Sequence, residues 1–304
     1  DPPAELLALE NPYDAGARDA AQINDIHWDH AFYNGRYYVY FGIVPCLLFQ
    51  LPFEALTGIQ NLAYAPCMVV LGLLLLAACF GLVGQAVRRW FPRTTSAAYL
   101  LAVAAVVLGG QLYYLLVRPY IYEYAILCGA ALLMLGLWLW LSAANTPVEK
   151  RGALLVRLAF GSLFVALVAG CRPQMELFAF LAVPIFWQRY IGQKRLRSRA
   201  GAGEAAAFLL PVVLVAAGLM WYNAARFGSP FDFGANYNLT GNDMTQRGFN
   251  AVRIGPAVFT SLFELPSWQG VFPFLRETDV QTNAVIRTIS EKFTGGILAT
   301  TPYL

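Results

Sequence analysis

The sequence predicts an all-α integral membrane protein, a multi-span helical bundle with a large first extracytoplasmic loop that contains juxtamembrane helices. Apolar residues make up 58% of the 304 positions and charged residues only 13%, whereas about a quarter of an ordinary soluble domain is charged. Several apolar runs reach about the 20 residues that a helix needs to cross a bilayer. Basic residues gather in alternate loops between these runs, as expected when such loops face the cytoplasm.

The composition also narrows the range of partners. A net charge of +3 is too small to indicate nucleic-acid binding, so we expect no nucleic-acid partner. The five cysteines have no CxxC or other metal-ligand spacing. Most of them lie in apolar runs, where a thiol behaves as a small hydrophobic group. The lipid bilayer is therefore the first partner that the sequence predicts.

We expect residues 1–63 to form the first outer loop, with a helix at about 40–58 that lies on the membrane surface. Pro45 and Pro52 interrupt this apolar run, and Glu54 lies inside it. A proline inside a helix costs about 3 kcal/mol, and a carboxylate in hydrocarbon costs about as much or more. These costs favour a bent helix at the membrane–water boundary over a helix that crosses the membrane.

The transmembrane bundle is predicted over residues 64–222. Its six spans are expected at 64–87, 96–117, 124–143, 154–169, 175–191 and 205–222. An outer loop follows at 223–293, and residues 294–304 begin a further membrane helix.

The orientation follows from the short-loop charges. Basic residues concentrate in the loops 88–93, 144–157 and 189–199, which we therefore expect in the cytoplasm. By alternation, the outer face holds residues 1–63, 118–124, 170–176 and 223–293. This alternation is kept only if the helix at 40–58 does not cross the membrane.

The first outer loop carries a dense group of candidate binding residues, namely His27, Trp28, Asp29, His30 and Tyr37. Tryptophan and tyrosine are enriched at membrane interfaces in any case, so the aromatic members also fit a simple interfacial belt. The two histidines, three positions apart, could ligate a metal ion, but no third ligand has a matching spacing. A hydrogen-bonding role explains the acid and the histidines better than a metal site does.

Two shorter outer loops each carry an arginine. Arg118 and Glu123 lie among tyrosines that include Tyr122. Two interpretations of this pair are open. Either Arg118 snorkels to the water and Glu123 is simply exposed, or the Glu123 carboxylate is held at the bilayer surface to bind a cation or orient a polar substrate. Arg172 precedes Pro173 where a helix begins, and its guanidinium can either bind two oxygens of a lipid phosphate or anchor its own helix.

Several segments carry a resemblance to a known family. These segments are ENPYDAGAR, YNGRYYVYFGIVP, LPFEALTG, GCRP and WYNAARFGSPFDFG. The pattern resembles bacterial membrane proteins of the C-type glycosyltransferase (GT-C) superfamily, in a branch related to the protein O-mannosyltransferases and the lipid A aminoarabinose transferase. The resemblance extends over nearly the whole chain, and it does not identify a substrate.

The resemblance implies an inverting glycosyltransferase of the bacterial cytoplasmic membrane, which moves a sugar from a polyprenyl-phosphate donor to an unknown acceptor on the outer face. Such an enzyme needs a carboxylate as general base, and the candidates in this chain are Asp14, Asp29 and Glu123. The candidate ligands of the donor phosphate are Arg36, Arg118 and Arg172. The candidate substrate-binding residues are His27, Trp28, His30, Tyr37 and Tyr122. A divalent cation could also neutralise the phosphate, although the sequence requires no cofactor or metal.

The chain departs from the family pattern at its start. The principal catalytic carboxylate of the family follows a first membrane helix, whereas this sequence begins at Asp1 in the first outer loop. We therefore expect a fragment that is inactive by itself, with its principal base upstream of residue 1. Asp14 and Asp29 lie in the corresponding loop and are kept as candidates for that role.

Two other functions stay open at this point. A transporter or flippase of lipid-linked sugars would bind the same ligand without chemistry, but it would need polar residues along a path through the spans, which contain few. A non-catalytic membrane subunit would use its outer loops to bind a partner, and its loop charges would not respond to the donor lipid. The sugar, the acceptor and the oligomeric state cannot be predicted from the sequence.

Overall fold

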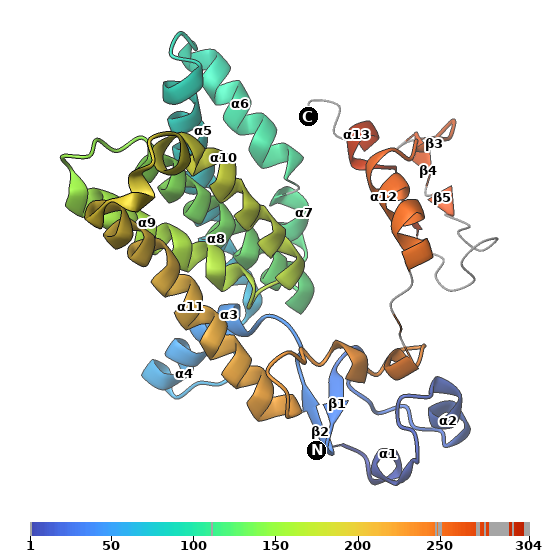
Figure 1. Ribbon diagram of the computed structural model, residues 1–304. Coiled ribbons are helices and arrows are strands. Elements are labelled where there is room, and N and C mark those ends of the chain that lie inside the picture. Colours follow the sequence, from blue (N-terminus) through green and yellow to red (C-terminus); the bar gives the residue numbers. More distant parts are fainter. Residues whose placement is uncertain are drawn as a thin grey trace. The chain divides into compact units, whose positions relative to one another are not determined.

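A computed structural model describes residues 2–110, 112–246, 248, 251–271, 274–276, 278–279, 292–293 and 295–300 of the chain. Two compact units are present, Asp1–Thr245 and Gln246–Leu304. Most described residues are helical, and the strands among them form three short two-stranded sheets. The prediction of a mainly α-helical chain is therefore confirmed (Figure 1).

The first unit begins with a small part that contains two short helices and a hairpin and, among its described residues, no helix long enough to cross a membrane. It contains the helices α1 (Ala4–Ala8) and α2 (Ala15–Ala20) and an antiparallel hairpin of β1 (Ala31–Tyr33) and β2 (Arg36–Tyr38). Asn34 and Gly35 form the hairpin turn, and both have positive φ, which suits the twist of a two-residue hairpin loop.

A segment from far along the chain completes this small part. The buried Leu239 joins the apolar core formed by Leu6, Ile23 and Phe32. Its backbone N–H donates to the carbonyl of His30 at 3.1 Å. The buried Arg18 donates to the carbonyl oxygen of Thr240, across 222 positions of sequence. The polar segment after the last long helix, including the short helix η5 (Ala235–Tyr237), thus folds with the amino-terminal residues.

A continuous but irregular helix occupies residues 43–57. It consists of α3 (Ile43–Pro45), the π-helical turn η1 (Cys46–Gln50) and α4 (Leu51–Thr57). Pro52 has no N–H to donate to the preceding turn, and a π turn accommodates such a loss. Gly42 and Gly58 bound the helix with left-handed backbone conformations. Its 15 residues span about 22 Å at 1.5 Å per residue, which is less than the hydrocarbon thickness of about 30 Å.

Four described helices are long and apolar enough to cross a membrane. They are α5 (Tyr64–Trp90), α8 (Ile121–Ala144), α9 (Arg151–Val168) and α11 (Arg199–Phe227). These helices lie over four of the predicted spans. They support assignment of the chain to a membrane protein, because a helix this apolar has no stable place in water unless it is covered.

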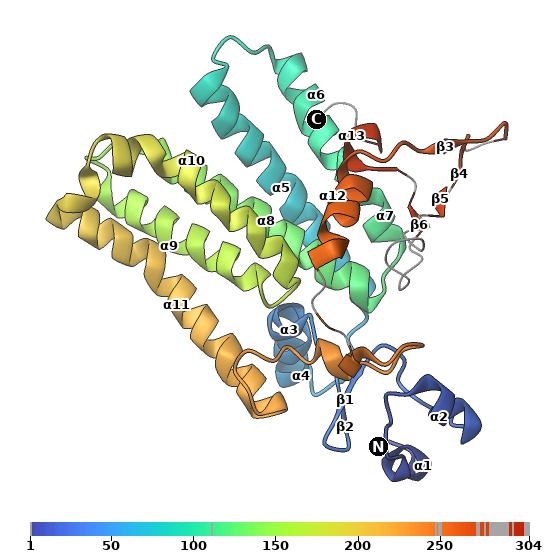
Figure 2. The same ribbon diagram turned by 45° about the vertical axis from the view of Figure 1, so that its right-hand side comes forward.

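The bundle is organised around α8, which lies between α5 and α9, while α11 packs along α9 (Figures 1 and 2). Helices α8 and α9 approach closely at Gly136 and Gly161, where a Cβ atom on Gly136 would lie 2.9 Å from the Gly161 carbonyl oxygen. Trp140 of α8 is fully buried, donates its indole N–H to Ser162 at 3.1 Å and stacks on Phe208 of α11. One side chain therefore ties three helices together.

Two predicted spans are not single regular helices. The run at 96–117 divides into α6 (Ser96–Gly109) and α7 (Leu112–Val117), because two glycines stand at the break. The run at 175–191 divides into the 3₁₀ helix η2 (Pro173–Leu181), α10 (Ala182–Phe186) and the π helix η3 (Trp187–Gly192). Pro173 and Pro184 lack the N–H groups that a continuous α-helix needs. A further 3₁₀ turn, η4 (Arg195–Arg197), leads into α11.

The second unit contains η7 (Ala251–Arg253), α12 (Ile254–Leu262) and α13 (Ile297–Thr300). Its strand pairs are β3 (Ser267–Trp268) with β4 (Leu275–Arg276) and β5 (Thr278–Asp279) with β6 (Lys292–Phe293). The short turn η6 (Met244–Gln246) lies where the two units join. Residues 280–291 of the predicted outer loop, and residues 294 and 301–304 of the predicted further membrane helix, lie outside the described residues.

Candidate functional site

Three segments that are distant in sequence meet at one end of the helical bundle. Asp29, in the loop before β1, accepts a hydrogen bond from the hydroxyl group of Tyr122 in the first turn of α8. Arg172, between α9 and η2, lies over the rings of Phe41 and Tyr122, with its Cζ atom 4.4 Å and 4.9 Å from the two ring centroids. The backbone N–H of Val44 donates to Gly170 at 3.2 Å. The structure thus brings together side chains from three of the four segments predicted to share the outer face, namely 1–63, 118–124 and 170–176.

A second acid and a second arginine lie beside this group. Glu123 follows Tyr122 in α8 and lies 3.6 Å from the Nε atom of Arg118. Arg118 also donates to the hydroxyl oxygen of Tyr114 at 2.5 Å. Glu123 lies in the first turn of α8.

Neighbouring charges oppose the effect of burial on the pKa values of Asp29 and Arg172. Burial raises the pKa of Asp29 above its ordinary value, although His30 and Arg172 act in the opposite direction. Burial lowers the pKa of Arg172, against the attraction of Tyr40, Asp29 and Glu123. Arg172 has no carboxylate within 4.0 Å among the described residues, and its buried Nε has no hydrogen-bond partner there. The guanidinium can therefore accept a further anion.

A cavity of about 340 Å³ is lined by Phe41 of the group and by residues of the irregular helix 43–57. Aromatic residues form a large part of its wall, among them Phe41, Tyr64, Tyr124 and Tyr222. The hydroxyl group of Tyr124 donates to the Gln50 side-chain oxygen at 2.9 Å, and the buried Gln50 Nε2 has no hydrogen-bond partner. Aromatic walls with one free donor suit a ligand that is partly apolar and partly hydroxylated.

Sequence reasoning missed one arginine near this cavity. Arg226, at the end of α11, lies 3.7 Å from the ring centroid of the cavity residue Tyr222. Arg226 donates to the carbonyl of Val39 at 2.9 Å and to the side chain of Asn223 at 3.0 Å. The sequence feature that could have identified Arg226 is its place at the predicted outer end of a span, where basic residues are depleted.

Two other predicted site residues lie outside the group. Asp14 is the N-cap of α2 and accepts a hydrogen bond from the backbone N–H of Gly16 at 2.9 Å. Arg36 is exposed beside the hairpin turn, opposite Tyr33. Within the described residues, its side chain makes no hydrogen bond or ion pair that would tie it to Asp29.

The remaining predicted binding residues form an aromatic neighbourhood around Asp29. The ring of His27 meets Tyr37 edge-on, with 4.7 Å between centroids, and lies 5.5 Å from the ring of His30. His30 contacts the carbonyl oxygen of Trp28 through Nδ1 at 3.0 Å, and Trp28 itself is 60% exposed. Among the residues that the structure describes, no three His, Cys, Asp or Glu side chains form a group able to hold a metal ion.

The fold and the site define a mainly helical protein with four apolar helices of membrane-spanning length and a polar, aromatic site at one end of its bundle. No protein-family model, curated protein or solved structure matches this chain. Its function must therefore be argued from the site itself.

Proposed function

We propose that the chain belongs to a membrane glycosyltransferase that moves a sugar from a polyprenyl-phosphate donor to an acceptor at the outer face of the bacterial cytoplasmic membrane. The observation that carries the proposal is the Asp29 carboxylate, which accepts a hydrogen bond from Tyr122 beside the Arg172 guanidinium. An acid that can take a proton and a cation that can bind a phosphate are the two groups that this chemistry needs.

The reaction assigns a role to the acid. The acceptor hydroxyl or amine attacks the anomeric carbon of the donor sugar, and its proton passes to the Asp29 carboxylate. The bond between the anomeric carbon and the phosphate oxygen breaks, and the electron pair leaves with the polyprenyl phosphate. A single displacement of this kind inverts the configuration of the anomeric carbon. The raised pKa of Asp29 makes the carboxylate a better proton acceptor than an ordinary aspartate.

The arginines act on the leaving group. Arg172 has an unpartnered Nε and no carboxylate within 4.0 Å among the described residues, so its charge is available to the departing phosphate. Arg118 is exposed and supplies further positive charge for the same group. The role of Glu123 is to orient Arg118 and to keep the local charge balanced. The aromatic cavity next to Phe41 would receive the sugar or the first isoprene units.

The test uses Asp29→Asn and Arg172→Gln in the full-length protein, expressed in cells that lack the native gene. We expect each variant to lower product formation by about 100-fold or more, which is the usual contribution of a general base or of a group that stabilises a leaving charge. Mass spectrometry of lipids and glycans would detect the accumulated lipid-linked sugar and the missing product.

Asp19→Asn is the matched control, because Asp19 is an exposed aspartate of α2 outside the site. Wild-type glycosylation by both Asp29→Asn and Arg172→Gln, at normal protein levels, would contradict the proposed roles. A transporter of the same lipid-linked sugar would move the donor between leaflets and leave its sugar–phosphate bond intact. Cleavage of the labelled donor by purified protein in vesicles therefore separates the two functions.

A further inference from the structure

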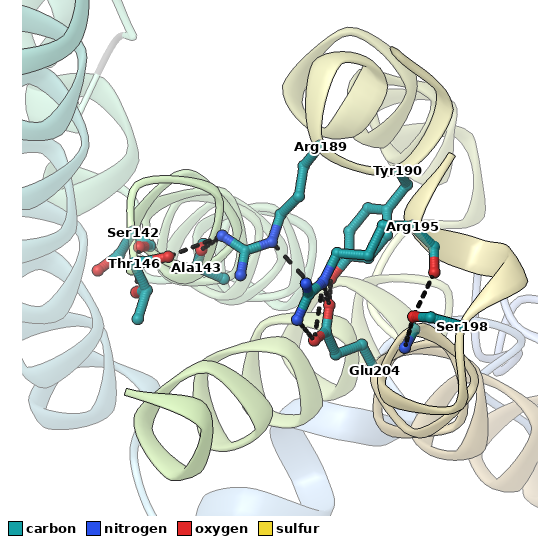
Figure 3. A network of polar contacts seen from close by, with 9 residues as sticks. Ser142, Ala143, Thr146, Arg189, Tyr190, Arg195, Ser198 and Glu204 are labelled. Atoms are coloured by element: carbon teal, nitrogen blue, oxygen red, sulfur yellow. Dashed lines mark hydrogen bonds and ion pairs between the residues drawn. The ribbon is translucent and has the colours of Figure 1, made fainter. Parts of the chain in front are cut away.

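The opposite end of the helical bundle contains a second polar group that the proposed reaction does not use. Glu204 of α11 is fully buried and is bound by Arg195 through bonds of 2.5–3.1 Å. Tyr190 donates to the same carboxylate at 2.8 Å. Arg189 lies between Glu204, 4.0 Å away, and the end of α8, where it donates to the Thr146 carbonyl oxygen at 2.7 Å. Figure 3 shows Arg189 extended between these two partners.

Arg189 retains binding capacity after these contacts. Its Nε and Nη2 atoms are buried and have no hydrogen-bond partner. Arg189 and Arg195 share the one Glu204 carboxylate, which lies 4.0 Å from Arg189 and accepts three hydrogen bonds from Arg195, so one positive charge of the three groups is left unbalanced. An unpaired buried N–H group is destabilising, so an added acceptor at this point would stabilise the structure.

A cavity of about 290 Å³ lies beside Arg189. Arg89, at the end of α5, forms another part of its wall, and Arg89 has no carboxylate within 4.0 Å among the described residues. Gln188 and Gln193 add two side-chain amides, neither of which makes a hydrogen bond inside the described part of the chain. The cavity therefore presents two cations and two neutral donors to one space, without an acid on its wall.

The surroundings favour an anion as well. The stretches 88–93, 144–157 and 189–204, which form this end of the bundle, contain eleven basic residues and two acidic ones, Glu149 and Glu204. Val148 and Ile185 supply an apolar side to the cavity. The helices that bring these residues together include α5 and α8, both long and apolar enough to cross a membrane.

We infer that this cavity binds a phosphate group through Arg89 and Arg189, and that its source is the headgroup of an anionic phospholipid. Guanidinium groups bind phosphate oxygens in pairs, and basic pockets between membrane helices bind such headgroups. The apolar side of the cavity then meets the glycerol and the first methylene groups of the lipid. The site is separate from the proposed transferase site, so either assignment can fail without the other.

The test measures lipid binding to the full-length protein in detergent by native mass spectrometry. The probes are dioleoylphosphatidylglycerol and dioleoylglycerol, which has the same acyl chains and no phosphate. We expect the phospholipid to bind at least about tenfold more tightly than the diacylglycerol. We expect Arg89→Gln to weaken phospholipid binding about tenfold, because one charge-assisted phosphate contact is lost.

Two control variants separate the site from a general attraction of charge. Arg88→Gln removes an exposed neighbouring charge that is not part of the cavity wall. Asn145→Ala removes the 3.3 Å hydrogen bond from Arg89 to Asn145 and leaves the charge in place. We expect both to bind the phospholipid within about twofold of wild type. Equal weakening by Arg88→Gln and Arg89→Gln, or equal binding of the two lipids, would overturn the inference.

Glycerol 3-phosphate distinguishes the two sources of the phosphate group. Failure of this soluble ester to displace the bound phospholipid at millimolar concentration supports the lipid headgroup. Binding of glycerol 3-phosphate at that concentration, with loss in Arg89→Gln and equal affinity for the two lipids, would assign the cavity to a soluble phosphate ester and overturn the lipid assignment. Arg189 is left unchanged in these tests, because it also donates to the carbonyl oxygens of Ala143 in α8 and of Thr146 just after it.

Discussion

Asp29 is fixed through both its backbone and its side chain. Its backbone φ is +61°, a conformation that few non-glycine residues adopt. Its N–H is fixed by the Leu239 carbonyl at 2.9 Å, and its carboxylate accepts from Tyr122. Strained backbone conformations held by their surroundings are common at functional sites. The orientation of the Asp29 carboxylate is therefore fixed by the Leu239 contact to its backbone and by the Tyr122 contact to its side chain.

The pH dependence of activity should report on this carboxylate. Burial raises the pKa of Asp29, and a general base works only when ionised, so activity should rise with pH through a value above that of an ordinary aspartate. Tyr122→Phe removes a hydrogen bond that favours the ionised form. We expect this variant to raise that pKa further and to move the acidic limb of the pH–rate profile upward by about one pH unit, since a hydrogen bond to a charged group contributes about 1.5–3 kcal/mol.

Tyr113→Phe is the matched control for that profile, because Tyr113 is 76% exposed on α7. Its acidic limb should coincide with that of wild type. An unshifted limb in Tyr122→Phe, measured as kcat/KM against pH, would argue that Asp29 does not supply the titrating group.

Residue types alone predicted part of the site. Asp29, Glu123 and Arg172 were selected because ionisable groups are costly beside apolar runs, and Tyr122 was selected with them as an aromatic neighbour. The structure brings these four near one another. The same reasoning also selected Asp14, whose side chain caps α2. An aspartate one residue before a helix carries a capping signal, but composition does not separate that signal from a catalytic one.

At the scale of elements, the lengths of the apolar runs predicted well where the regular helices lie. The helices α5, α8, α9 and α11 cover their predicted spans and extend beyond most of their ends. Helix α11 begins at Arg199, six residues before the predicted start at 205, and so includes the charged residue Glu204. Arg195 and Tyr190 bind that carboxylate inside the protein, and such long-range pairing is not encoded in local hydropathy.

Close contact between α8 and α9 leads to a prediction on stability. A methyl group on Gly136 would lie 2.5 Å from the side chain of Val165 and 2.9 Å from the carbonyl of Gly161. Gly136→Ala must therefore push the two helices apart, and overpacking of this kind costs about 1–3 kcal/mol. We expect a lower thermal unfolding midpoint, measured for the full-length protein in detergent.

Gly218→Ala provides the control for that substitution. Gly218 lies inside α11, and a Cβ atom there would meet no atom within 4 Å. Alanine favours a helix by about 1 kcal/mol over glycine, so this variant should be neutral or more stable. Equal midpoints for Gly136→Ala and wild type would mean that the helix contact is looser than the structure indicates.

At the scale of the whole molecule, the two polar groups lie at opposite ends of the long helices of the first unit. Asp29, Tyr122 and Arg172 gather at the start of α8, whereas Arg89 and Arg189 gather at its end. The exposed apolar surface in between is clearest in α11, whose most apolar window has no buried residue. An apolar helix surface of this extent requires a lipid environment or another protein.

This arrangement predicts opposite accessibility for the two ends in a membrane. The basic loops should face the cytoplasm, so a cysteine at Arg197 should be protected from a membrane-impermeant maleimide in intact spheroplasts and labelled after permeabilisation. A cysteine at Glu10 should be labelled in both states. Both positions are exposed, and Cys46, the exposed native cysteine among those described, would be replaced by serine. Labelling of Arg197→Cys in intact spheroplasts would place the basic end outside, and the Asp29 group could not then meet a donor on the outer face.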